Sequence, residues 1–328
     1  MYTYQDIRDV ESVCYEQKHT NKVLEQINKT FPGYFEEYLA NEGSVEIAEK
    51  DIKRIVSIFG SEVEIGKKKN NDKTQSFKNI IIRRLNDFEK DRQKYRDILD
   101  EEVLEEYKDD PRSFKSKTLR RECPIINKTL NTHAKALEKY KQDFGMSDPV
   151  ELLEVVTNLF EFAVDYAENV YDPDNYDSIT EYDDLCISDI DTDDYTVYGV
   201  IGGGIKSHLL YKYDPSVFPS RSRLAIWALW YLTDQKVIDC EMDSEFLMLN
   251  LTENTTQQNY FYPYTLFTFY AHRIFQMLNA EAESLGVWLD PDYRYVIVDS
   301  FLEYVAMSHI SGITEMTYQI KESNYGGE

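Results

Sequence analysis

The sequence predicts a mainly α-helical protein, and three observations support this prediction. Apolar residues recur at helical spacing in three long segments, helix-capping residues stand at several segment ends, and two later segments are apolar on nearly every face. Hydrophobic residues make up 42% of the 328 residues and charged residues 29%, which is typical of a folded globular chain. We expect an N-terminal helical region with a three-helix coiled-coil-like bundle, an acidic linker, and an aromatic-rich, mostly helical C-terminal domain.

Residues 1–66 are expected to form a small N-terminal helical unit. Within it, Ser44 is a suitable cap and Gly60 a suitable end for a segment whose apolar residues recur at helical spacing. The polar, basic stretch 67–73 that follows is typical of an exposed loop.

Residues 67–170 are expected to form a bundle of long helices. Three segments, 81–99, 126–144 and 152–170, repeat apolar residues about every 3.5 positions, as a coiled-coil-like seam requires. Gly145 is a suitable end for the second helix, and Asp148, Pro149 and Glu151 form a capping sequence for the third. The short connection between them predicts antiparallel packing.

The helical pattern is lost in residues 171–194, which we interpret as an acidic linker and the domain boundary. Residues 195–328 hold all three tryptophans. Segments 222–232 and 264–285 have almost no polar face, and helices of that kind lie in protein interiors.

Acidic residues are concentrated in the middle of the chain. Between Gln142 and Ile205 there are seventeen carboxylates and no lysine or arginine, so this stretch carries most of the net charge of −24. Such a block favours a non-catalytic intracellular interaction or regulatory subunit that docks on a basic protein surface, with DNA mimicry as one version. The expected partner-binding residues are Asp183, Asp184, Asp189, Asp191, Asp193 and Asp194.

The glycine run 202–204 supports an alternative function. It separates a possible strand from a possible helix, where its amides would face an anion and Lys206 would stand near a phosphate. The motif departs from a P-loop because Ile205 separates the lysine from the last glycine. The competing, purely structural explanation of the three glycines is that they form a tight turn or allow another element to approach closely.

The alternative function is therefore a phosphate- or nucleotide-binding enzyme sited in the C-terminal domain. Convergence of its basic side chains in one concave pocket would favour it, whereas pairing of the two arginines with nearby aspartates would be structural. The expected ligand-binding residues are Gly203, Gly204, Lys206, His208, Arg221 and Arg223.

No cofactor is expected for an interaction subunit. Under the alternative, Asp189, Asp191 and Asp193 would hold a divalent cation, although an EF-hand is excluded because the twelfth loop position is Val200. The sequence has no Gly-x-Ser-x-Gly nucleophile elbow and no zinc motif, and its histidines include no pair at metal-ligand spacing. It therefore does not decide whether the protein is an enzyme.

The remaining expectations concern location and partners. We expect a cytoplasmic protein that does not enter a membrane, because no basic leader or spanning apolar run is present and four scattered cysteines fit reduced thiols. Two basic stretches, 67–84 and 112–121, do not outweigh the net negative charge, so direct nucleic-acid binding is not expected. The helical seams are compatible with a homo-oligomer.

Overall fold

The computed structural model describes residues 12–45, 72–134, 137–240, 244–250 and 255–318. Helices dominate these residues, and their two strands form one antiparallel sheet, so the mainly α prediction is confirmed. The predicted segment between Ser44 and Gly60 lies almost entirely outside the described residues.

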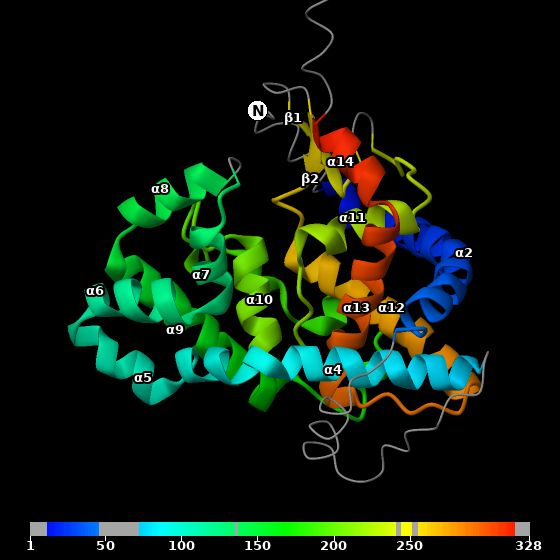
Figure 1. The fold of residues 1–328 in the computed structure, drawn as a ribbon, viewed down its shortest axis with the longest axis horizontal. Coiled ribbons are helices and arrows are strands. Elements are labelled where there is room, and N and C mark those ends of the chain that lie inside the picture. The colour runs from blue at the N-terminus through cyan, green and yellow to red at the C-terminus, as the bar shows by residue number, and fades with distance from the viewer. Residues whose placement is uncertain (1–11, 46–71, 135–136, 241–243, 251–254, 319–328) are drawn as a thin grey trace, which may run out of the picture.

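Helix α13 is the central helix of the C-terminal half, and α2, α4, α11, α12 and α14 (Ile310–Tyr318) pack against it (Figure 1). Most of its side chains are buried, as are most of those of α11 and α12, which are the two segments predicted as interior helices. The bounds are α2 (Gln17–Glu42), α4 (Lys73–Ile98), α11 (Arg223–Leu232), α12 (Tyr264–Ser284) and α13 (Arg294–Ser308).

Helix α4 runs along the α13 group and leads from it to a second group of helices, α5 to α9 (Figure 1). Helix α10 lies between the two groups and contacts both α4 and α9. The bounds are α5 (Glu101–Glu106), α6 (Pro111–Ser113), α7 (Pro124–Asn131), α8 (Glu138–Met146), α9 (Pro149–Asp165) and α10 (Gly203–Tyr213), with a 3-10 turn at Tyr107–Asp109 and a π-helix at Phe114–Glu122.

One predicted long helix is interrupted. The segment 126–144 forms α7 and α8 with an irregular connection between them, and His133 is exposed there rather than in a helix seam. The hydroxyl of Thr132 donates to the carbonyl of Lys128, and such side-chain bonds, together with the weak helix formers Asn131, Thr132 and His133, compete with helix continuation.

The first and third predicted helices are confirmed as α4 and α9. Asp148 caps α9 by accepting a hydrogen bond from the amide of Val150 at 2.9 Å, as its sequence context predicts. The helix continues as a π-turn at Tyr166–Val170.

The acidic connector, residues 171–194, consists of short 3-10 turns fixed to the core by buried side chains. The hydroxyls of Tyr176 and Tyr295 lie 2.7 Å apart, and Asp177 pairs with the fully buried Arg294 at 2.7 Å. Its acidic side chains therefore face outward from an anchored segment. The turns are Tyr176–Ser178, Asp183–Leu185, Ser188–Asp191 (η7) and Asp193–Tyr195 (η8).

The last elements are a hairpin and the C-terminal helices. Strands β1 (Leu247–Asn250) and β2 (Thr255–Gln258) pair antiparallel, and α14 (Ile310–Tyr318) contacts β2 and α13. No single helix of the described residues is long and apolar enough to cross a membrane, although the bent pair 291–308 and 310–317 together meets the criteria of length and composition.

Candidate functional site

A cleft of about 730 Å³ lies where the N-terminal ends of α10, α11 and α12 meet. Five of the six ligand-binding residues expected from the sequence line it, and His208 does not. The lining members of that set are Gly203, Gly204, Lys206, Arg221 and Arg223. We refer to this feature as the glycine-run cleft.

The glycine run is explained by the close approach of Arg221. A Cβ atom at Gly203 would collide with Nη1 of that arginine, whereas one at Gly202 would meet nothing within 4 Å. The guanidinium lies against the start of α10 and donates to the carbonyl of Asn259 at 2.9 Å. The structural interpretation of the run is therefore correct for Gly203.

Arg221 is almost completely buried, and its Nε has no hydrogen-bond partner in the described structure. Burial lowers its pKa to about 10, and the charge of Asp191 opposes that change. No ion pair joins Arg221 or Arg223 to a carboxylate among the described residues, so the expected structural salt bridges are not observed. The cleft thus contains a fixed cation that is only partly satisfied.

Lys206 is also buried, and its Nζ donates to the carbonyl of Ile190 at 2.6 Å. Burial lowers its pKa, and Asp191 acts in the opposite direction. The lysine thereby ties α10 to the acidic connector and adds a second positive charge beneath the cleft.

The N-terminal end of α10 differs from the two other helix ends at the cleft. Ser222 caps α11 by accepting from the amide of Ala225 at 3.1 Å, and Asp191 caps α12 by accepting from the amides of Tyr264 and Thr265 at 2.8 and 3.0 Å. No side chain of the described residues accepts a hydrogen bond from the first turn of α10. Its amides therefore present an open anion-binding end.

Arg223 and Asp193 are two further charged residues that line the cleft. Arg223 is the first residue of α11, and its side chain is exposed, with no ion pair or hydrogen bond to another described residue. Asp193 accepts a hydrogen bond from the hydroxyl of Tyr198 at 2.5 Å. Lys206, Arg221 and Arg223 outnumber Asp191 and Asp193, so the cleft is locally positive in a chain of net charge −24.

Aromatic side chains form the rim of the cleft, and the sequence analysis did not single them out. Tyr260 and Phe261 are 53% and 56% exposed, which is unusual for large rings in a folded protein. The sequence signal was their position in a run of four aromatic residues interrupted only by Pro263.

His208 lies away from the cleft. Its ring packs edge-on to Tyr95 with centroids 5.4 Å apart, and burial, followed by the charge of Lys212, lowers its pKa to about 4. A neutral histidine among aromatic rings serves packing, so we remove it from the candidate ligand residues.

Four of the six predicted partner-binding aspartates are exposed outside the cleft, whereas Asp191 and Asp193 line the cleft itself. Asp189 and Asp194 line a separate groove of about 450 Å³ together with Glu161 and Asp165 of α9. Asp183 and Asp184 are exposed on a neighbouring 3-10 turn. Of the six aspartates, Asp191 is committed to capping α12.

Comparison of the chain with protein families, with curated proteins and with solved structures finds no match.

Proposed function

We propose that this protein binds a phosphate-bearing ligand of nucleotide size in the glycine-run cleft. The observation that carries the proposal is the uncapped N-terminal end of α10, which faces the same cleft as Lys206, Arg221 and Arg223. Aligned helix amides and fixed cations together stabilise a phosphate. A volume of about 730 Å³ lies within the range of small-molecule sites.

Each part of the cleft has a distinct role in the proposal. The first-turn amides of α10 hold the phosphate, and Arg223 reaches it from an exposed position. Lys206 and Arg221 act mainly through their charge, because each already donates to a backbone carbonyl. Tyr260 and Phe261 offer ring faces for a base, and Asp193 offers a carboxylate to a divalent cation bound to the phosphate.

Isothermal titration calorimetry of the full chain with ATP, AMP, inorganic phosphate and adenosine tests the proposal. We expect the three phosphate compounds to bind, and adenosine to bind more weakly than AMP. Arg223→Gln should weaken ATP binding about 10-fold, because a charged hydrogen bond contributes about 1.5 kcal/mol or more. Arg112→Gln, which removes an exposed arginine on α6, is the matched control and should change nothing.

A second pair of variants tests the glycine run. Gly203→Ala should displace the Arg221 guanidinium and weaken binding, whereas Gly33→Ala, in α2 and outside the cleft, should not, because its added Cβ meets nothing within 4 Å. Binding that does not depend on the phosphate, or an Arg223→Gln variant with wild-type affinity, would contradict the proposal.

The acidic face supports a second candidate function, docking on a basic protein surface as an interaction or regulatory subunit. Four aspartates there are exposed, and none forms an ion pair with a described residue. Two of them line a groove with Glu161 and Asp165, and carboxylates placed around a groove also support the DNA-mimic version of this function. These residues are Asp183, Asp184, Asp189 and Asp194.

Affinity purification from the native host with mass spectrometry would identify the partner. Changing the four aspartates to asparagine should abolish its capture while preserving the fold, because exposed charges affect association more than stability. Asp191 is left unchanged because it caps α12. The control changes four exposed glutamates elsewhere to glutamine: Glu25, Glu37, Glu106 and Glu283.

The two sets of variants separate the two functions. If double-stranded DNA displaces the partner, the DNA-mimic version is supported. Capture that survives neutralisation of the four aspartates, or that fails equally in the glutamate control, would contradict docking through this face.

A further inference from the structure

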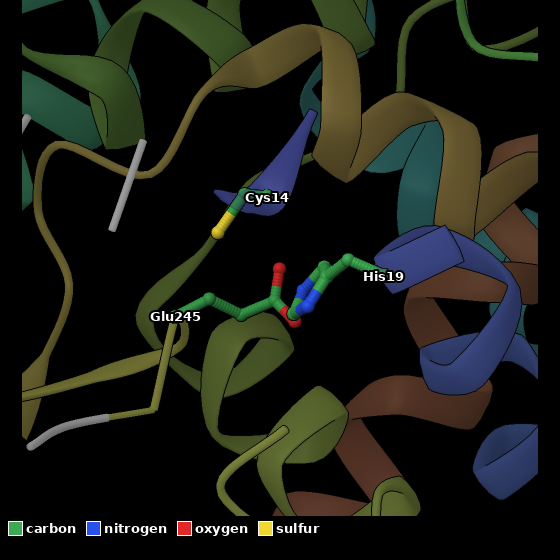
Figure 2. A group of neighbouring side chains, drawn as sticks. All are labelled: Cys14, His19 and Glu245. Atoms are coloured by element: carbon green, nitrogen blue, oxygen red, sulfur yellow. The ribbon is translucent and has the colours of Figure 1, made fainter. Parts of the chain in front are cut away.

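A cluster of buried ligand-type side chains lies at the start of α2, outside the glycine-run cleft. The sulfur of Cys14, a ring nitrogen of His19 and a carboxylate oxygen of Glu245 all lie within 4.8 Å of one another. Figure 2 shows the three side chains directed toward a common point from separate segments. Their exposures are 1%, 0% and 3%, so the cluster is closed to solvent.

A second thiol adjoins this cluster. Cys240 shares a side-chain hydrogen bond with Cys14. The turn that carries Cys240 is held against α2 by Lys22, whose Nζ lies 2.5 Å from Asp239 Oδ1. Lys22 is three residues after His19, so this contact brings Cys240 to the same side of the helix.

Glu245 is positioned by its neighbours as a metal ligand would be. Its Oε1 lies 2.8 Å from His19 Nε2, and Tyr262 donates its hydroxyl to Oε2 at 2.8 Å. The side chain of Asn259 donates to the Glu245 backbone carbonyl at 2.9 Å. Hydrogen bonds of this kind orient carboxylate ligands in protein metal sites.

His19 and Glu245 form a buried pair, with a hydrogen bond of 2.8 Å between Nε2 and Oε1. His19 Nδ1 has no partner in the described structure. Two thiols remain beside this pair, and a buried polar group without compensation is costly.

We propose that Cys14, His19 and Glu245 form a binding site for a zinc-class divalent transition metal, with Cys240 as the adjacent fourth ligand. Thiolate, imidazole and carboxylate are all zinc ligands, whereas calcium and magnesium require oxygen ligands throughout. Tetrahedral bonds of about 2.0 to 2.3 Å place ligand atoms roughly 3.3 to 3.8 Å apart. The His19–Glu245 contact of 2.8 Å must lengthen by about 0.5 Å to reach that geometry, and any other separation above about 3.8 Å, within the 4.8 Å limit, must shorten. The metal replaces the proton between His19 and Glu245, and this proton and those of the thiols are released to solvent.

Cobalt and zinc titration of the full chain, reduced and freed of metal with a chelator, tests the site. We expect one cobalt ion per chain with tetrahedral visible absorption and a thiolate-to-cobalt charge-transfer band in the near ultraviolet. Zinc should displace it. Reduced wild-type protein that binds neither ion would overturn the proposal without any variant.

Variants then assign the ligands. Cys14→Ser should remove about half of the charge-transfer band, since Cys240 supplies the other thiolate, and should weaken zinc binding by more than about 10-fold, whereas Cys186→Ser, an exposed thiol elsewhere, should do neither. Glu245→Gln keeps hydrogen-bonding capacity toward His19 and Tyr262 while removing the carboxylate, so it protects the test against simple misfolding. Wild-type zinc affinity in both Cys14→Ser and Glu245→Gln would overturn the assignment.

Mass spectrometry of protein purified without reductant gives one further outcome. A Cys14–Cys240 disulfide whose reduction restores no metal binding would also overturn the proposal. The site shares no ligand with the proposed phosphate subsite, and metal titration without nucleotide therefore tests it independently of the proposed function.

Discussion

Asp299 on α13 should destabilise the folded protein at neutral and alkaline pH, and its replacement by asparagine should relieve this. Burial raises the pKa of Asp299 from 3.8 to about 7, and the neighbouring Glu303 acts in the same direction. Arg84 is the nearest opposing cation, but it already lies 2.6 Å from Glu303 and 3.1 Å from Glu42. Because Arg84 is held by these two carboxylates, it stabilises an ionised Asp299 only weakly.

The sign and size follow from that pKa. A folded-state pKa above the unfolded value means that the native state binds the proton more tightly, so this contribution falls as pH rises from 3.8 to about 7. A shift of roughly 3 units corresponds to about 4 kcal/mol as an upper bound, at about 1.4 kcal/mol per unit. Asp299 keeps partial solvent contact, so we expect about 2 kcal/mol.

Urea unfolding of the wild type and of Asp299→Asn at pH 5 and pH 8 measures the effect. The variant should exceed the wild type in free energy of unfolding by about 2 kcal/mol at pH 8 and by roughly half as much or less at pH 5, where only part of the pKa range from 3.8 to about 7 has been crossed. Asp292→Asn, an exposed position in the turn before α13, is the matched control. A difference between variant and wild type that is the same at both pH values would refute the reasoning.

Two further predictions concern the acidic connector. Asp191→Ala should lower the free energy of unfolding by about 1 to 2 kcal/mol and speed hydrogen exchange at the amides of Tyr264 and Thr265, because α12 loses its cap; Asp183→Ala should do neither. Sodium chloride should raise the melting temperature by a few degrees, since screening relieves repulsion among the exposed carboxylates, and a flat response would mean that they are internally compensated. A magnesium response greater than that at matched ionic strength would indicate a discrete cation site.

Local sequence signals predicted those helices whose ends are fixed by nearby capping residues and whose buried faces follow a regular apolar spacing. Asp148 and Pro149 marked the start of α9, because caps act within one turn of the residue that provides them. The break between α7 and α8 was missed because the apolar spacing continues across it. Hydroxyl-to-carbonyl bonds such as that of Thr132 interrupt the helix without disturbing that spacing.

The candidate sites depend on contacts that sequence spacing does not record. The requirement for glycine at position 203 arises from Arg221, which approaches from another element. His19 and Glu245 are 226 residues apart and meet at 2.8 Å only after folding. The sequence therefore supplied the basic residues of the cleft, while the open end of α10 and the Cys14 cluster required the structure.

The acidic connector depends on helices that follow it in the chain. Tyr176 bonds to Tyr295, 119 residues later, and Asp191 bonds to Tyr264, 73 residues later. A nascent chain that has emerged only as far as α11 lacks both partners, and contacts over such separations form late because loop closure is slow. The glycine-run cleft contains both Asp191 and Tyr264, so it is completed only once the C-terminal helices have been synthesised and have docked.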